Sequence, residues 1–266
     1  MEHTKNAVLA VRSVSMNFGG LRALSEVDLE VRKGEVVALI GPNGAGKTTF
    51  FNCITGIYTP TEGDVVAVLR NGKEKRINGM RTNHVCELGM ARTFQNIRLF
   101  PSMTALENVM IGRHCRTKEG ILGAILRGPK TRREEQQVVD TSYQLLKKVG
   151  LEHVANEYAK NLPYGAQRRL EIARALATEP FLLLLDEPAA GMNPQETLEL
   201  KEMVIQIRKE FDVSVLLIEH DMKMVMSLSD RIYVMEYGRV ISTGTPAEVS
   251  ADPQVIRAYL GEETDA

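Results

Sequence analysis

The sequence has few cysteines, and none of them is spaced like a metal-binding or redox-active pair. Three occur among its 266 residues, and no two of them form a CxxC pair. We therefore expect neither a disulfide framework nor a zinc site, and a reducing compartment fits this usage best. Cys53 stands among apolar residues, where we expect it to serve as a small apolar filler.

An excess of positive charge is also missing. Lys and Arg total 33 against 34 Asp and Glu, for a formal net charge of -1. Binding to nucleic acid rests on a basic excess that neutralises phosphates and releases counterions. No nucleic-acid partner is therefore expected, although local basic patches are compatible with this balance.

Long hydrophobic runs are absent as well. The strongest, Phe181–Leu185 and Val213–Ile218, are far shorter than the roughly 20 residues that a membrane-spanning helix needs. The first residues, Met1–Val8, lack the basic-then-apolar pattern of a secretory signal. We expect a cytoplasmic protein that reaches a membrane, if it serves one, through partner proteins.

Short apolar and β-branched runs alternate along the chain with segments of helical periodicity. The runs expected to form strands are Val8–Val11, Val27–Val31, Val36–Ile40, Leu182–Leu185, Val213–Ile218, Arg231–Met235 and Arg239–Ser242. The expected helices are Lys47–Ile54, Thr104–Ile111, Arg132–Val149, Ala166–Ala177 and Glu196–Phe211. Such alternation predicts an α/β fold with a parallel sheet and right-handed crossovers.

One long stretch interrupts this alternation. From about Asn96 to Thr178 there is almost no strand pattern, which predicts a mainly helical lobe inserted into the α/β core. Within it, Arg113–Glu135 is rich in charge and glycine and predicts a loop or a broken helix. We favour a solvated surface insertion there over a dedicated binding patch. The final segment, Pro246–Gly261, predicts two short helices broken at Asp252-Pro253.

A glycine-rich motif follows the expected strand Val36–Ile40 and precedes an expected helix. It matches GxxxxGK[ST], the P-loop or Walker A pattern, with the residues Gly41, Pro42, Asn43, Gly44, Ala45, Gly46, Lys47 and Thr48, and Thr49 follows them. Glycines let the backbone point several N–H groups into one concavity, and the helix adds its positive end. Lys47 would reach the β- and γ-phosphates and Thr48 would offer its hydroxyl to Mg²⁺. The motif predicts a site for the phosphates of a nucleotide.

A second motif supplies the carboxylates that phosphoryl transfer needs. Leu182–Leu185 predict a buried strand whose end delivers Asp186 and Glu187 to the carboxyl edge of the sheet, where open α/β folds bind ligands. We expect Asp186 to hold Mg²⁺ through water and Glu187 to polarise the attacking water. Neighbouring side chains along a strand point in different directions, so the two roles are sterically compatible. The residues that follow, Pro188–Gly191, are predicted to form a loop.

These and four further motifs, taken in their order, resemble the ATPases of ABC (ATP-binding cassette) systems over essentially the whole chain. Arg92–Gln95 is similar to the Q-loop of these ATPases, and Leu162–Leu176 is similar to the signature and its helix. Gly191–Pro194 is similar to the D-loop, and Leu217–Asp221 is similar to the switch-histidine loop. The resemblance implies a mainly parallel core sheet, an antiparallel β subdomain and an inserted helical lobe. It also implies one domain over residues 1–266, with the core and β subdomain in 1–95 and 178–245, the lobe in 96–177 and a helical extension in 246–266.

The resemblance also implies roles for residues outside the two phosphate-site motifs. Gln95 would reach Mg²⁺ and the attacking water, and His220 would act as a switch near the γ-phosphate. Phe18 matches the aromatic residue that stacks on adenine, with a core phenylalanine as the alternative. The signature residues would face ATP held by a second protomer, so that ATP lies between two subunits and hydrolysis separates them. Those residues are Tyr164, Gly165 and Ala166.

The signature departs from the LSGGQ pattern of the family. Pro163 removes a hydroxyl and an N–H, Tyr164 replaces the first glycine, and Gly165 is retained. The usual D-loop aspartate is Asn193. We interpret this as a sign of two unlike ATPase subunits, in which this chain brings a complete phosphate cradle and a modified signature; a homodimer is the alternative.

Several segments resemble the longer of the two ATPases in branched-chain (hydrophobic) amino acid importers. They are Phe18–Leu21, Phe94–Phe100, the Tyr164-Gly165 signature, Glu187–Pro194 and the ending Val255–Gly261. This resemblance implies a second, shorter ATPase, two membrane permeases and a solute-binding protein, with the chain peripheral on the inner face of the plasma membrane. ATPases that serve urea or amide import or lipopolysaccharide extraction share much of the pattern, and a soluble ABC protein that acts on DNA or ribosomes is a further alternative.

We expect a permease to dock in the groove between the expected lobes, near Leu99–Met110. Four apolar side chains there would either hold a short coupling helix or form the core of the lobe. They are Phe100, Met103, Leu106 and Met110.

Overall fold

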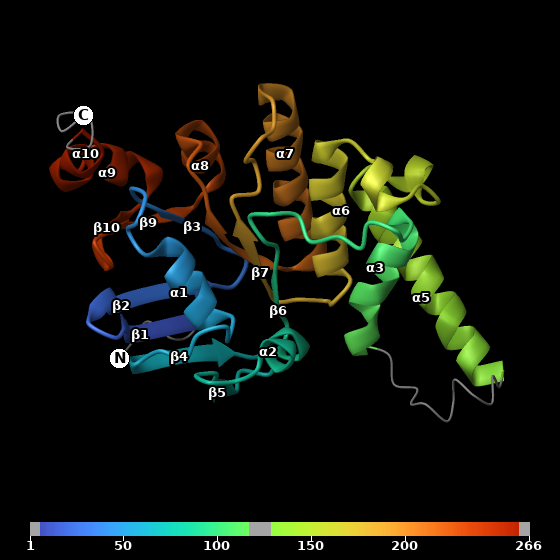
Figure 1. Cartoon of the computed structure of the whole chain (residues 1–266), viewed down its shortest axis with the longest axis horizontal. Helices are drawn as coiled ribbons and strands as arrows, with labels where there is room; N and C mark the ends of the chain where they lie inside the picture. The colour runs from blue at the N-terminus through green and yellow to red at the C-terminus, as the bar shows by residue number, and fades with distance from the viewer. Residues whose placement is uncertain (1–5, 117–128, 261–266) are drawn as a thin grey trace. The chain divides into compact units, whose positions relative to one another are not determined.

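A computed structural model of the chain describes residues 6–116 and 129–260 (Figure 1). The chain divides into two compact units, the first made of Met1–Arg92 and Phe181–Ala266 and the second of Thr93–Pro180. The helical lobe expected for residues 96–177 falls within the second unit. Within the described ranges, no helix is both long and apolar enough to cross a membrane.

Six strands form the main sheet of the first unit, in the order β10-β9-β3-β8-β7-β6. They are β3 (Val36–Ile40), β6 (Met90–Arg92), β7 (Leu182–Asp186), β8 (Ser214–Ile218), β9 (Arg231–Glu236) and β10 (Arg239–Gly244). The pairs from β9 to β6 are parallel, and β10 pairs with β9 in the antiparallel sense. Every residue of β3, β7 and β8 is buried, as their near-continuous apolar sequences require. The predicted parallel core is confirmed.

A second sheet of the first unit is antiparallel, in the order β2-β1-β4-β5. Its strands are β1 (Ala7–Phe18), β2 (Leu21–Arg32), β4 (Glu62–Val68) and β5 (Glu74–Arg76). β1 and β2 contain the predicted runs Val8–Val11 and Val27–Val31 and extend beyond them. The predictions missed β4, β5 and β6, because β4 opens on turn-forming residues and strands of three residues show no period.

Six helices of the first unit are described. They are α1 (Lys47–Ile54), α2 (Thr82–Leu88), α7 (Pro194–Phe211), α8 (Met222–Leu228), α9 (Pro246–Ser250) and α10 (Pro253–Leu260). Two of them, α7 and α9, begin with a capping box. The prediction for α1 is correct at both ends, and the predicted break at Asp252-Pro253 separates α9 from α10. α7 begins before the predicted Glu196 because Asn193 caps it, and the two residues exchange side chain-to-backbone bonds of 2.9 Å.

Helices make up most of the second unit. α3 (Ala105–Arg113), α5 (Pro129–Lys148) and α6 (Tyr164–Leu176) pack against one another (Figure 1). Short 3₁₀ turns occur at His114–Arg116, Glu152–Val154 and Ala159–Asn161. Gly112 permits the close approach of α3 to α6, since a Cβ there would lie 2.3 Å from the carbonyl oxygen of Arg174. In the part of this unit that the structure describes, β pairing is limited to one isolated bridge between Thr104 and Tyr158, which agrees with the predicted helical lobe.

The charge-rich segment 113–135 is described at its two ends. Arg113 ends α3, and a 3₁₀ turn follows it. α5 begins at Pro129, before the predicted Arg132, so residues 129–135 are helical, as the alternative of a broken helix allows. Residues 117–128 lie outside the described residues, and the predicted surface insertion stays a prediction for them.

Candidate functional site

The glycine-rich motif forms the turn between β3 and α1, at the carboxyl end of a buried strand. Gly41 has a φ of 146°, and a Cβ there would lie 2.0 Å from the carbonyl oxygen of Met235, so glycine is required. Gly46 is the N-cap residue of α1 and no side chain caps that helix. Its first amide groups can therefore meet an anion, as a phosphate site demands.

Lys47 is buried against the loop that precedes it. Its Nζ donates to the carbonyl oxygens of Gly41 (2.5 Å) and Pro42 (2.8 Å). A buried ammonium requires such partners, because an unpaired charge is costly to bury. Asn43 and Thr48 of the same loop are exposed. Uncapped amides, a cation and an exposed hydroxyl thus occur within one turn, and this donor set fits the phosphates of a nucleotide.

Asp186 ends β7 and is 3% exposed. Its Oδ2 accepts a hydrogen bond of 2.6 Å from the guanidinium of Arg92 at the end of β6. Arg92 also donates to Asn52 Oδ1 (2.8 Å) and Thr55 Oγ1 (3.2 Å) at the end of α1. These charge-assisted bonds fix the carboxylate relative to the helix that begins at the phosphate loop.

The donors for Mg²⁺ in this unit form a partial set. The described ranges contain no group of three or more His, Cys, Asp or Glu residues that would enclose a metal ion. In nucleotide sites Mg²⁺ keeps several waters and takes one or two protein ligands beside the substrate phosphates. The exposed hydroxyl of Thr48 and the carboxylate of Asp186 are hard oxygen donors that fit this requirement.

Glu187 directly follows β7 and has an unusual backbone conformation. Its φ is 47°, in the left-handed region that few non-glycine residues adopt. Its N–H donates to the carbonyl oxygen of Ile218, at the end of β8, over 2.9 Å. The Oε1 of Glu187 lies 3.0 Å from Nε2 of His220, which comes just after β8. Two predicted catalytic side chains therefore meet at the carboxyl edge of the sheet.

Glu219 stands between β8 and His220 and is 3% exposed. Its Oε1 accepts a hydrogen bond from the N–H of Ala189 (2.7 Å), and its Oε2 accepts from His220 (3.0 Å) and, at 3.4 Å, from Asp221. Burial raises the pKa of Glu219, the three N–H bonds oppose that rise, and the charge of Glu187 adds to it. A single buried carboxylate thus binds two loops of the candidate site.

Phe18 ends β1 and is 41% exposed. Its ring meets that of Tyr58 edge to face, with the centroids 5.2 Å apart. The alternative of a core phenylalanine is therefore wrong. An exposed aromatic ring in the unit that holds the phosphate loop is compatible with stacking on a base.

The signature residues lie in the second unit, in the first turn of α6. Tyr164 is 44% exposed, whereas Gly165 and Ala166 are buried. Pro163 is the N-cap residue and no side chain caps the helix, so its first amides can meet an anion. Gln95 belongs to the same unit and is exposed.

Arg168, in the next turn of α6, is fully buried and connects the signature helix to the Q-loop backbone. Its guanidinium donates to the carbonyl oxygens of Phe94 (2.6 Å) and Gln95 (2.7 Å). It also donates to Glu171 Oε2 (3.0 Å) and to the hydroxyl of Tyr164 (3.2 Å). Within the second unit, the backbone that carries Gln95 is therefore fixed by α6.

Sequence reasoning assigned no role to Arg92, Arg168 or Glu219, although each stands inside a recognised motif. Arg168 carried a usable signal, because helical spacing places it on the same face as the apolar Ile172. A charge on an apolar face needs a partner, and Glu171 lies three positions further on. Glu219 directly follows an apolar strand. This position indicates that its side chain is buried, but it does not identify the groups to which it bonds.

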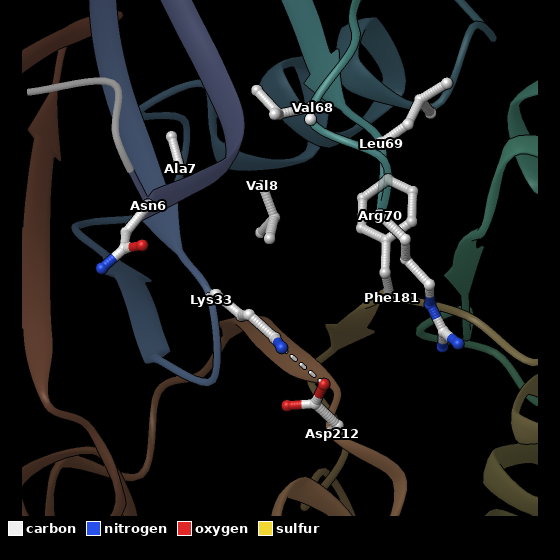
Figure 2. Close-up of a pocket in the computed structure, with 10 residues that line it drawn as sticks. Asn6, Ala7, Val8, Lys33, Val68, Leu69, Arg70, Phe181 and Asp212 are labelled. Atoms are coloured by element: carbon white, nitrogen blue, oxygen red, sulfur yellow. Dashed lines mark ion pairs between the residues drawn. The ribbon is translucent and has the colours of Figure 1, made fainter.

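A separate hollow of about 260 Å³ lies in the first unit. Figure 2 shows Lys33, Asp212 and Phe181 around it, with Lys33 Nζ paired to Asp212 Oδ2 over 2.7 Å. These residues precede β3, β8 and β7, whereas the candidate site residues end or follow the same strands. The hollow is therefore not part of the phosphate site.

Comparisons with known proteins show the family to which the chain belongs. A family model described as "ABC transporter" matches residues 24–190, and one described as "Branched-chain amino acid ATP-binding cassette transporter" matches residues 239–265. The high-affinity branched-chain amino acid transport ATP-binding protein LivG of Salmonella typhimurium is 48% identical over 96% of this chain and 98% of its own. Its counterpart BraF of Pseudomonas aeruginosa is 47% identical over the same shares of the two chains, 96% and 98%.

Solved structures with this fold include nucleotide-bound cassettes. The ADP conformation of MJ1267, an ATP-binding cassette of an ABC transporter, has a TM-score of 0.82 and 32% identity over 96% of this chain and 99% of that one. The dimeric post-hydrolysis state of the cassette MJ0796, bound to ADP and Pi, has a TM-score of 0.73 and 25% identity over 90% and 98%. The chain therefore belongs to the ABC transporter family, as an ATP-binding cassette.

Proposed function

We propose that the chain hydrolyses ATP and thereby energises the import of branched-chain and other hydrophobic amino acids. The observation that carries the hydrolytic part is the 3.0 Å contact between Glu187 and His220 in the unit that holds the phosphate loop. The cargo is supported by LivG and BraF, which are described as branched-chain amino acid transport proteins, and by the family match at residues 239–265.

ATP binding would use the phosphate loop and one aromatic ring. The amides of residues 41–49 and the ammonium of Lys47 surround the phosphates, and Phe18 stacks on the adenine. Bound Mg²⁺ would neutralise charge on the phosphates, with Thr48, Gln95 and Asp186 as its protein donors. The 2.6 Å bond from Arg92 keeps Asp186 in one orientation before the nucleotide arrives.

Hydrolysis would depend on Glu187. Its carboxylate accepts a hydrogen bond from the attacking water and takes its proton as the water oxygen bonds to the γ-phosphorus. The bond from that phosphorus to the bridging oxygen breaks, and ADP leaves with the electron pair. His220 holds the Glu187 carboxylate at the observed distance, and Gln95 orients the water.

A complete site would require a second ATPase subunit. Tyr164, Gly165 and Ala166 begin a helix whose uncapped amides suit an anion, and we propose that they face the γ-phosphate bound to the partner. The dimeric MJ0796 structure with ADP and Pi supports such a pair. The altered signature favours an unlike partner over a second copy. Equal turnover by the chain alone and by the mixed pair would contradict this preference.

An open hollow of about 530 Å³ in the second unit is our candidate for the permease contact. The residues that line it are Met103, Glu107, Met110, Ile111, His114 and Val138. Two of the four apolar residues proposed from the sequence, Met103 and Met110, line it. Phe100 is exposed, and the other three are partly buried. A short amphipathic helix of a membrane permease fits such an apolar floor with a polar rim. The chain would then lie peripherally on the inner face of the plasma membrane.

The test is solute uptake by cells that lack this gene, supplied with labelled leucine, isoleucine, valine, alanine or urea. We expect uptake of leucine, isoleucine and valine to fail, and to return with the wild-type gene and with a Glu199→Gln control at an exposed position of α7. Glu187→Gln should bind ATP but hydrolyse it at least about a hundredfold more slowly and restore no uptake. Intact uptake of all three amino acids would refute the cargo, and normal turnover by Glu187→Gln would refute the assigned base.

A further inference from the structure

We propose that Glu219 is a positioning residue for hydrolysis, which holds the loops after β7 and β8 together so that Glu187 meets His220. This inference rests on the proposed function. It concerns a residue whose carboxylate bonds to backbone N–H groups of the two loops that carry the catalytic side chains.

The geometry is a bridge with one carboxylate oxygen on each side. Oε1 accepts from Ala189, two residues after Glu187, and Oε2 accepts from His220 itself. The backbone bond from Glu187 to Ile218 joins the same two loops one step closer to the strands. Together these bonds and the 3.0 Å side-chain contact form a closed ring around the candidate base.

The bridge requires two acceptors at once. Both oxygens of Glu219 accept backbone N–H groups. Ala189 and Glu219 are both buried, so water cannot replace a lost bond between them, whereas His220 on the other side is exposed. A glutamine has nearly the same shape but offers one acceptor and one NH₂ group, which cannot accept from an N–H. One of the two loops must therefore lose its bond to this side chain, and on the Ala189 side the N–H left without a partner is buried.

The turn that carries Glu187 depends on such support. A left-handed backbone at a non-glycine residue is strained and persists only where its surroundings hold it in place. The bond from Ala189 to Glu219 anchors the residues that follow this turn. When that anchor is lost, we expect the Glu187 carboxylate to sample other positions, whereas the phosphate loop, which precedes α1, keeps its own contacts.

The first experiment compares Glu219→Gln with Glu35→Gln in the full-length protein. Glu35 is the matched control, because its Oε2 also accepts two bonds, from the N–H of Arg32 and from the guanidinium of Arg231, each over 2.8 Å, but it lies just before β3 and far from the carboxyl end of that strand. For Glu219→Gln we expect kcat to fall about 10- to 100-fold, with the KM for ATP and the affinity for a fluorescent ATP analogue unchanged within about twofold. Amide hydrogen exchange should quicken at residues 187–192 and 218–222 and stay unchanged at residues 41–48.

Two further variants separate position from charge and from fold. Glu219→Asp keeps the charge but is one methylene shorter, so it cannot reach both loops, and we expect a loss of kcat of similar size. In a His220→Ala background, Glu219→Gln should add little further loss, because residues that act through one another are not additive.

The inference is overturned if Glu219→Gln leaves kcat and loop exchange unchanged, if Glu35→Gln loses as much, or if the losses of Glu219→Gln and His220→Ala simply multiply. Should both Glu219 variants fail to fold while Glu35→Gln folds, the residue is structural and the inference also fails. Intact uptake of leucine, isoleucine and valine without the gene, or wild-type protein that hydrolyses no ATP, would instead refute the proposed function, so the two failures are distinguishable.

Discussion

The ion pair between Arg168 and Glu171 in α6 gives a prediction about stability. Arg168→Met removes a guanidinium that is 0% exposed and leaves Glu171, 1% exposed, without its 3.0 Å partner. Glu171 keeps a longer contact of 3.9 Å to Arg174 and a bond from the N–H of Arg98. Removing one member of a buried pair costs about 3–5 kcal/mol, because the other charge stays buried. We expect a loss of this size in the free energy of unfolding.

The pH dependence of that loss identifies its cause. Burial raises the pKa of Glu171, and the charge of Arg168 opposes the rise, so Arg168→Met should raise this pKa further. A carboxyl group whose pKa is higher in the folded chain destabilises the fold when ionised, and the penalty declines as pH falls through the folded pKa. The penalty vanishes when the pH falls below the pKa of a glutamate in the unfolded chain, about 4.3. The difference between wild type and variant should therefore be larger near pH 8 than near pH 5.

Urea denaturation followed by circular dichroism at the two pH values measures this difference. The matched control is the double variant Arg168→Met with Glu171→Leu, which removes both charges and should recover most of the lost stability. An equal loss at both pH values would show that the ionised carboxylate is not the cause. A double variant as unstable as the single one would refute the reasoning as well.

Two other predictions concern single side chains. Lys47→Ala removes a charged donor to the phosphates and should weaken binding of a fluorescent ATP analogue about 10- to 100-fold. The control is Lys223→Ala, at an exposed position. Equal affinity of the two variants for the analogue would show that Lys47 does not bind the phosphates. Burial raises the pKa of Cys53 to about 11, so at pH 8 a maleimide should label it more slowly than the partly exposed Cys86 and Cys115. Mass spectrometry of the labelled peptides would contradict this if Cys53 reacted first.

The parts of the fold that the sequence predicts are those with contiguous signals. The apolar run Val36–Ile40, the glycine-rich loop and the helix α1 follow one another without a gap, and β3 and α1 are predicted to the residue. β6 has three residues and is stabilised mainly by its register with β7, where Met90 pairs with Leu182. Such a strand depends on a partner far away in the sequence, so local patterns do not indicate it.

The candidate site divides in the same way. Lys47 and Asp186 are predictable from their motifs, because each role depends on residues close by in sequence. The Arg92–Asp186 bond spans 94 positions, and the contact between Glu187 and His220 depends on the parallel pairing of β7 with β8, which sets Asp186 opposite Ile218. The motifs place Glu187 and His220 in one site, but the contacts between side chains follow from strand pairing, which local sequence patterns do not encode.

The boundaries of the second unit have a consequence for how such proteins diversify. The unit begins directly after β6 and ends directly before β7, and these strands are parallel neighbours. In topological terms the entire lobe is therefore one enlarged crossover of a β-α-β unit. The entropic cost of closing such a connection grows only slowly with its length. Insertions and deletions between residues 93 and 180 should therefore cost little chain entropy, provided that β6 and β7 keep their register.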